Sequence, residues 1–212
     1  MIRFSHFVGT MVAAVVISAN ADTSPGDVRY SVTKDESKAN IKRTVEVVLD
    51  QRVDQQTLES LAQKIKDSKP GSYQRTFIGW RIKCEESGAY WVKTDYLPNL
   101  SVQFLGSTLA QYNQLQSPGT TVEGEVFGSW VGTWGADYKM VGYRKAGKTF
   151  IRSTYTDGAS GTTELVEKTI SGRSALVDVE GSDFDEYYSV NARGDLEFWG
   201  EGGNYYTAKA IH

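Results

Sequence analysis

The chain has 212 residues, a formal net charge of −3 and one cysteine, Cys84. Acidic and basic residues are interspersed without a Lys/Arg-rich stripe, which argues against nucleic acid as a main partner. A single cysteine excludes an intramolecular disulfide, so packing alone must stabilise the core. Because two acidic residues follow it, we interpret Cys84 as an unreactive, half-buried residue at a strand end, with an intermolecular disulfide as the alternative.

The first 21 residues have the pattern of an export signal. Arg3 supplies a short positive segment, and residues 7–19 form an apolar stretch that is too short to span a bilayer. The triplet Ala19-Asn20-Ala21 matches the small-x-small rule for cleavage. We therefore predict a signal peptide at residues 1–21, cleavage after Ala21 and a periplasmic or secreted location, with an uncleaved anchor as the alternative. No later apolar run is long enough to predict a membrane span.

The next part of the chain is predicted to mix strands and helices. Residues 22–42 are polar and predict a flexible arm with one short strand at 28–32. Asp54 is a candidate N-cap, and Leu58 and Ile65 belong to a one-faced amphipathic helical pattern. In residues 43–116 we expect a strand at 44–49, a helix at 55–68, strands at 75–82, 89–94 and 100–106, and a helix at 107–116. This order is a β-α-β-β-β-α unit of the α+β class.

The last part of the chain is predicted to be all-β. Residues 117–122 are typical of a linker, and the helical period disappears after them. Eight short strands, each bounded by turn residues, are expected at 125–132, 137–144, 148–155, 162–168, 174–180, 185–191, 195–199 and 204–211. Residues 123–212 therefore predict an antiparallel eight-strand meander, either barrel-like or an open, strongly curved sheet packed on the first part. The barrel-like form is favoured.

Aromatic residues of the all-β part often occur as sequence neighbours, such as Tyr187-Tyr188 and Phe198-Trp199. Because side chains alternate across a strand, each such pair puts one ring inside and one outside. Cross-strand ring pairing is the favoured explanation, and a cover formed by a protein or by a ligand such as a sugar ring is the alternative. The candidate ligand-binding residues are Trp130, Trp134, Tyr143, Tyr188, Trp199 and Tyr206.

The triplet Gly128-Ser129-Trp130 opens the meander and resembles the G-x-W motif of lipocalin-like barrels. The meander also resembles one in exported bacterial proteins of unassigned activity, so the resemblance implies a fold and not a function. In the lipocalin motif the Trp packs across the barrel floor and the Gly lets the first strand bend, which implies a core position for Trp130. Trp134 would share the face of Trp130 only if the strand continued through Gly132, and the turn-like residues around it favour the rim.

The available chemistry is restricted by the two histidines, His6 in the predicted signal and His212 at the last position. Ser-His-Asp and Cys-His catalysis therefore lack their base, and zinc sites built from His and Cys lack their ligands. The sequence contains no phosphate-loop or dinucleotide-binding glycine motif, and we predict no cofactor and no metal. Clustered carboxylates could serve a glycosidase or bind calcium, but we interpret them as a solvated acidic loop. The residues of this acidic-loop candidate are Asp178, Glu180, Asp183, Asp185 and Glu186.

Three hypotheses for function remain. The first is an exported, non-enzymatic binding protein that recognises a protein partner as an inhibitor or immunity-type factor. The second is a carrier of a small apolar, lipid or sugar ligand inside the barrel, with Trp130, Trp134 and Tyr143 at the pocket. The third is a carboxylate-dependent hydrolase of an envelope polymer, held lowest because no second carboxylate cluster faces the first. An enzymatic role is thus not favoured.

Overall fold

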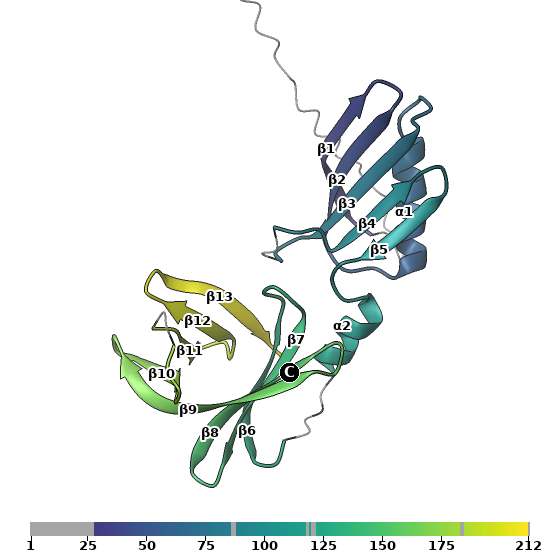
Figure 1. The fold of residues 1–212 in the computed structure, drawn as a ribbon. Coiled ribbons are helices and arrows are strands. Elements are labelled where there is room, and N and C mark those ends of the chain that lie inside the picture. The colour runs from purple at the N-terminus through teal and green to yellow at the C-terminus, as the bar shows by residue number, and fades with distance from the viewer. Residues whose placement is uncertain (1–27, 86–87, 118, 120–121, 183–184, 212) are drawn as a thin grey trace, which may run out of the picture.

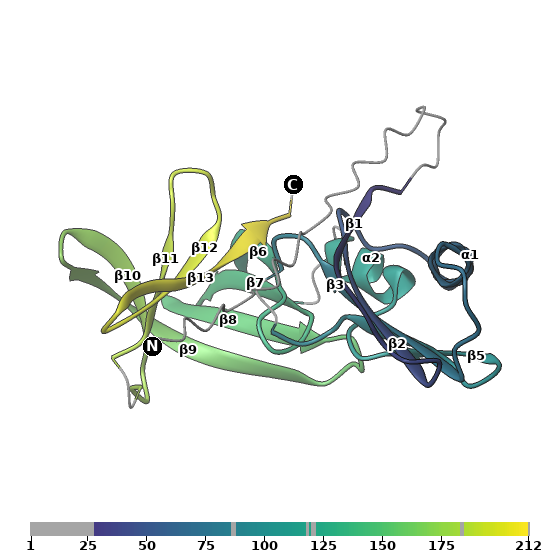
Figure 2. The same cartoon turned by 90° about the horizontal axis from the view of Figure 1, so that it is seen from above.

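The computed structural model describes residues 28–85, 88–117, 119, 122–182 and 185–211. The predicted signal peptide, its cleavage site and residues 22–27 of the predicted arm lie outside these ranges, so export stays a prediction. Two parts are joined through the short helix α2 (Leu109–Gln116), and we call them the sheet domain (residues 28–108) and the barrel (residues 123–211) (Figure 1). Figure 2 shows the two parts beside each other from above, with the barrel strands on the left.

The sheet domain is a mixed five-stranded sheet with one long helix. Its strands, in the spatial order β1-β2-β3-β4-β5, are β1 (Tyr30–Lys38), β2 (Lys42–Leu49), β3 (Arg75–Ile82), β4 (Val92–Tyr96) and β5 (Leu100–Phe104). Strands β2 and β3 are parallel, and the connection between them contains α1 (Gln55–Asp67), which covers one face of the sheet (Figure 1). The remaining neighbours are antiparallel, and they need only short connections.

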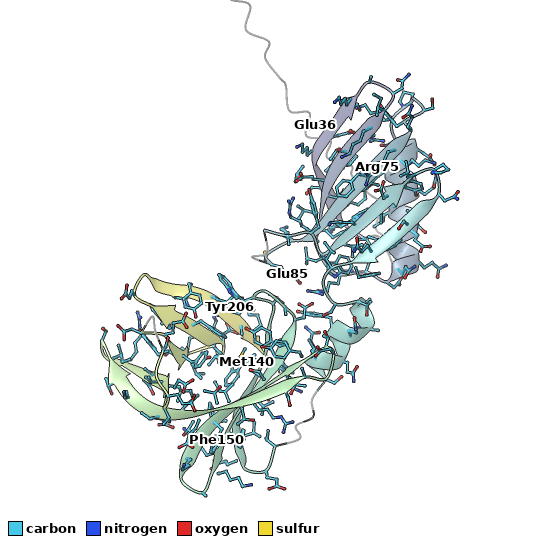
Figure 3. The ribbon with its side chains drawn as sticks, in the orientation of Figure 1. Glu36, Arg75, Glu85, Met140, Phe150 and Tyr206 are labelled. Carbon is cyan, nitrogen blue, oxygen red and sulfur yellow. The ribbon has the colours of Figure 1, made fainter. Side chains whose placement is uncertain are left out.

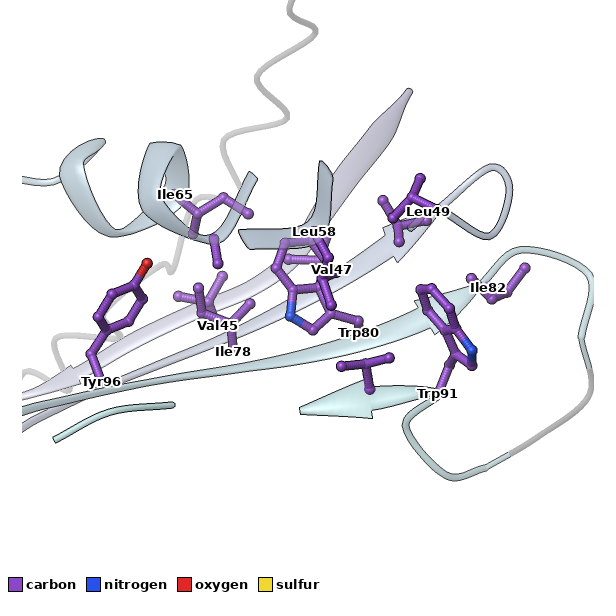
Figure 4. Close-up of a cluster of buried hydrophobic side chains, with 13 residues drawn as sticks. Val45, Val47, Leu49, Leu58, Ile65, Ile78, Trp80, Ile82, Trp91 and Tyr96 are labelled. Carbon is purple, nitrogen blue, oxygen red and sulfur yellow. The ribbon is translucent and has the colours of Figure 1, made fainter. Parts of the chain in front are cut away.

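The core of the sheet domain lies between α1 and the sheet (Figure 4). Asp54 begins the helix, because its side chain accepts a hydrogen bond from the Thr57 backbone N–H at 2.7 Å. Leu58 and Ile65 then pack against alternate residues of β2 and β3, among which Trp80 is fully buried. The apolar face of the helix and the alternating apolar residues of the strands therefore form one buried layer, as the sequence pattern predicts.

Some sequence predictions in this domain are wrong. Residues 30–38 were expected in the flexible arm, apart from the short strand at 28–32, and they form β1. Backbone pairing with β2 makes this strand while its side chains stay mostly exposed, so no apolar alternation marks it. Cys84 is exposed rather than half-buried, because it lies in the turn after β3 with a φ of +64°. The strand expected at 89–94 begins later, at Val92.

The barrel contains eight antiparallel strands and is closed. Its strands are β6 (Glu125–Gly132), β7 (Tyr138–Lys145), β8 (Lys148–Tyr155), β9 (Ser160–Ile170), β10 (Arg173–Asp178), β11 (Tyr187–Val190), β12 (Leu196–Gly200) and β13 (Gly203–Ala210). Closure comes from the pairing of β13 with β6, in which Ala210 lies opposite Trp130. The predicted α+β class and eight-strand meander are confirmed, and the barrel-like form is the one that the chain adopts.

Large rings and glycines together fill the barrel interior. Trp130 has no exposed surface, and its indole Nε1 donates a hydrogen bond to the Gly194 carbonyl at 2.7 Å. A Cβ on Gly128 would lie 2.2 Å from the Trp130 ring, and one on Gly142 would lie 2.5 Å from the Phe127 ring. These glycines therefore give the rings their space. The buried cluster comprises Trp130, Met140, Ile151, Leu165, Leu176, Leu196, Tyr206 and Ala208, which confirms the expected core position of Trp130.

Candidate functional site

The two ends of the barrel differ in structure. We call one end the mouth; its loops are 133–137, 156–159, 179–186 and 201–202, of which residues 183–184 lie outside the described structure. We call the other end the closed end; its turns are 146–147, 171–172 and 191–195. The Trp130 indole reaches the last of these turns through its bond to Gly194, so the ring lies across the interior near the closed end. The exposed aromatic rings that suggest a binding site lie at the mouth.

A group of aromatic side chains lines the mouth, and we call it the aromatic rim: Trp134, Tyr138, Tyr155, Tyr188, Phe198, Tyr205 and Tyr206. The Trp134 ring centroid lies 5.7 Å from that of Tyr205 and 5.5 Å from that of Tyr206. The exposed fractions are 48% for Trp134, 41% for Tyr155 and 36% for Tyr205. Contacts between rings therefore hold a large aromatic surface in place while leaving it open to solvent.

The rim also carries phenol hydroxyl groups. Burial, reinforced by the neighbouring phenols, raises the pKa of Tyr138 well above its usual range. Burial and the hydrogen bond to Glu186 raise the pKa of Tyr205 to about 12. The Tyr205 hydroxyl donates to Glu186 Oε1 at 3.0 Å, and the Tyr206 hydroxyl accepts from the Thr133 backbone N–H. Tyr138 and Tyr205 are therefore neutral hydrogen-bonding groups near pH 7 and are not suited to act as bases.

A buried arginine connects the mouth to the sheet domain. Arg52 follows β2, and 4% of its side chain is exposed. Its guanidinium donates to both Asp137 oxygens at 2.8 and 3.0 Å and to both Glu85 oxygens at 2.9 and 3.0 Å. The ring of Tyr112, on α2, lies 4.2 Å from Arg52 Cζ. Because Asp137 ends the loop that carries Trp134, this ion cluster positions the rim relative to the sheet domain; Figure 3 shows Glu85 between the two parts.

The Arg52 cluster is structural rather than a site for a ligand. Besides the two carboxylates, the guanidinium donates to the Ser107 carbonyl at 3.0 Å, so its five N–H donors all have acceptors. The Trp91 indole donates to the same carbonyl at 2.8 Å. Burial raises the pKa of Glu85, and the attraction of Arg52 opposes that effect. Removing the arginine would therefore leave two carboxylates facing each other without a cation.

The predicted ligand-binding residues separate into three groups. Trp134, Tyr188 and Tyr206 belong to the aromatic rim, and the exposure of Trp134 confirms its expected place there. Trp130 lies inside the barrel. Tyr143 and Trp199 lie on the outer wall, because their sequence neighbours Gly142 and Phe198 face inward. There Tyr143 stacks on Phe150 at 5.3 Å, and Trp199 stacks on Tyr187 at 6.2 Å.

The acidic-loop candidates lie at the mouth, except that Asp183 is outside the described residues. Asp178 ends β10 and accepts a hydrogen bond from the Glu180 backbone N–H at 2.8 Å. Asp185 and Glu186 precede β11, and Glu186 is the acceptor for Tyr205. In the part of the chain that the structure describes, no group of three or more His, Cys, Asp or Glu side chains could hold a metal ion.

Sequence reasoning missed several residues of the site. Tyr138, Tyr155, Phe198 and Tyr205 belong to the rim but were not among the candidates. Their positions at the mouth-side ends of predicted strands could have indicated them, because alternate turns of a meander lie at the same end. No sequence signal could have indicated Arg52, since its partner Asp137 lies 85 residues away.

No family model, curated protein or solved structure matches the chain. The lipocalin resemblance therefore stays a prediction. Among the described residues, no helix is both long enough and apolar enough to cross a membrane.

Proposed function

We propose that this chain is an exported, non-enzymatic binding protein that recognises a protein partner with the aromatic rim of its barrel. The observation that carries the proposal is Trp134, a tryptophan that is 48% exposed and packed against two tyrosine rings. Tryptophan and tyrosine dominate the binding energy of protein interfaces, because they bury a large area and lose little conformational freedom. An inhibitor or immunity-type role fits this mode of recognition.

Preorganisation of the rim supports the proposal. The Arg52 cluster anchors the loop of Trp134 at Asp137, and the Thr133 N–H bond to Tyr206 anchors the same loop at its other side. A partner would therefore meet rings that are already ordered, and little free energy would be lost in ordering them. The packed interior below the rim, which includes Trp130 and Met140, favours recognition at the surface over enclosure of a ligand.

A small-molecule, lipid or sugar carrier is the alternative function. Ring faces next to phenol hydroxyls, as at Tyr205, are groups that also bind sugars and other small amphipathic ligands. Such a ligand would lie on the rim rather than deep in the barrel. Native mass spectrometry of freshly purified protein tests this alternative, which requires a co-purifying ligand that is lost in Trp134→Ala and retained in Tyr143→Ala.

The hydrolase hypothesis remains the weakest. Asp178 and Glu180 of the acidic loop line a hollow together with Glu164, but Asp178 accepts a backbone hydrogen bond and Glu164 pairs with Lys148. Glu186 is hydrogen-bonded by Tyr205. A two-carboxylate mechanism requires an acid and a base or nucleophile on opposite sides of the scissile bond. Loss of glycan cleavage in Glu186→Gln would be needed to revive it.

Site-specific photo-crosslinking tests the protein-binding function. The full chain, expressed in its native host, carries p-benzoylphenylalanine in place of Trp134 in one sample and in place of Tyr143 in a matched control. Position 134 is expected to give a light-dependent adduct with one recurring protein, while position 143, on the outer wall, gives none. The proposal fails if position 134 yields no adduct or if both positions yield the same adducts.

A further inference from the structure

The mouth carries carboxylates that have no cation. The described residues of its loops include Asp137, Asp157, Glu180, Asp185, Glu186 and Glu201, and they include no Lys or Arg. Asp137 pairs with Arg52. The other five make no salt bridge with any residue that the structure describes. Their charges therefore add to one negative field over the mouth, and no ion pair with a described residue compensates them.

At the closed end of the same barrel, acidic side chains form ion pairs with lysines. Asp195 pairs with Lys209 at 3.0 Å, and Glu123 pairs with Lys145 at 2.9 Å. Lys148 and Arg173 flank the turns at this end. The turns and strand ends at the closed end therefore carry cations beside their acids, whereas the described loops of the mouth carry acids alone.

The unpaired acids and the exposed rings are joined in one structure. Glu186 Oε1 accepts a hydrogen bond from the Tyr205 hydroxyl at 3.0 Å. The Tyr205 ring packs against the Trp134 ring, with 5.7 Å between the two ring centroids. A carboxylate and an exposed indole therefore both contact one tyrosine. Aromatic faces attract cations through their quadrupole, and a nearby carboxylate adds a full charge to that attraction.

We propose that the partner of the mouth is a protein that presents a basic segment, whose Arg or Lys side chain lies on the Trp134 ring and pairs with Glu186. This inference rests on the proposed function and adds the chemistry of the partner. An acidic segment would be repelled by the five unpaired carboxylates, and a neutral one would bury them without a counter-charge. A guanidinium suits the site best, because it stacks on a ring and donates to a carboxylate at the same time.

Peptide binding to the full-length protein tests this inference. The probes are two twelve-residue Gly/Ser peptides, one with three arginines and one with three citrullines, which are uncharged and nearly the same shape. Calorimetry is run at ionic strengths of about 0.05 and 0.3 M, where charge screening differs strongly. The variants are Trp134→Ala and Glu186→Gln, with Tyr143→Ala and Glu123→Gln as controls that remove the same groups from the outer wall and the closed end.

We expect the arginine peptide to bind and the citrulline peptide to bind at least roughly tenfold more weakly. Each mouth variant should weaken arginine-peptide binding by roughly tenfold, and neither control should change it by more than about twofold. Equal binding of the two peptides, no binding of either, or equal effects of Glu186→Gln and Glu123→Gln would each overturn the inference. A recurring photo-crosslink at position 134 would leave the proposed function standing in those cases.

A second copy of this chain, whose closed end carries Lys148 and Arg173, is the competing occupant. Sedimentation of the unliganded protein across a concentration series measures self-association directly. Concentration-dependent association that Trp134→Ala abolishes would assign the mouth to a second copy and overturn the inference. A monomer at all concentrations, together with arginine-peptide binding, supports it.

Discussion

The two ends of the barrel use the same residue types for opposite purposes. At the closed end, Trp130 is fully buried and bonded to a backbone carbonyl, and Asp195 is paired with a lysine. At the mouth, Trp134 is nearly half exposed, and Glu186 has no cation partner among the described residues. A fully buried tryptophan and a paired acid therefore lie at one end of the barrel, and an exposed tryptophan and an acid without a cation lie at the other.

The separation of stability from recognition has a physical basis. A ring that fills the core is surrounded on all sides, so any change to it leaves a cavity or a clash. The exposed ring of Trp134 contacts its neighbours with only part of its surface, so its solvated part can bind a partner without disturbing the fold. Trp130 and Trp134 are four positions apart, and Gly132, the last residue of β6, marks the change from interior strand to mouth loop.

Replacing the two tryptophans should separate the ends most clearly. Trp130→Ala is expected to lower the free energy of unfolding by about 3–5 kcal/mol, because the largest buried side chain of the barrel core would leave a cavity. Trp134→Ala should change it by less than about 1 kcal/mol, because half of that ring is already solvated. Urea denaturation followed by far-UV circular dichroism measures both. Equal losses of stability would contradict the comparison.

Removing the arginine between the two parts tests how the mouth is held. Arg52→Met should cost about 3 kcal/mol, because Asp137 and Glu85 would remain partly buried and mutually repelling. The double replacement Arg52→Met with Asp137→Asn should recover part of that loss. Thermal unfolding measures stability, and amide hydrogen exchange of residues 133–137 measures the order of the loop. Unchanged exchange would show that the rim is ordered without the cluster.

Adding one methyl group inside the barrel should have a smaller effect. In Gly142→Ala the new Cβ would lie 2.5 Å from the Phe127 ring and 3.0 Å from the Trp130 ring, so we expect a cost of about 1–3 kcal/mol. Gly161→Ala, in β9 near the mouth, is the matched control, since its Cβ would meet nothing within 4 Å. The same denaturation assay compares them, and a neutral Gly142→Ala would show that the interior is loosely packed.

The smallest expected difference is in pH dependence. Burial would raise the pKa of Asp195, but Lys209 and the Ala210 N–H outweigh it and lower the pKa. The stability from this shift is present above the ordinary pKa of about 4 and is lost as pH falls below it through the lowered pKa of the folded state. Asp195→Asn should therefore reduce the loss of stability in acid. Thermal melts across acidic pH values measure this loss, and an unchanged acid slope would contradict the assignment.

At the mouth, the pKa of Tyr205 is raised rather than lowered, so its effect on stability appears in alkali and not in acid. The pKa of Tyr205 is raised to about 12, so its contribution is present below its ordinary pKa of about 10 and is lost as pH rises from there through 12. Tyr205→Phe should therefore reduce the loss of stability in alkali. Thermal melts between about pH 9 and 12 compare the stability of the two proteins, and the difference in tyrosinate absorbance between them reports the titration of Tyr205. A titration of Tyr205 near its ordinary pKa would contradict the expectation.

Much of the fold could be predicted, because the strands and their turns are specified by residues that are close together in the sequence. The eight strands of the barrel follow the expected ranges closely, since each pattern of alternating residues ends at a turn, as at Gly147 and Gly172. Strand β1 could not be predicted, because its residues are held by backbone bonds to β2 and not by an apolar face. The aromatic rim was predicted only in part, because its rings come from different strands and meet only when the barrel closes.

The sequence by itself determined the class of fold and the core position of Trp130. Both depend on residues that are close together in the chain. The tertiary structure alone decided that the sheet closes, that Arg52 connects the two parts, and that unpaired acids and exposed rings share one end. These depend on residues that are far apart in the chain, whose proximity is set by packing and strand register.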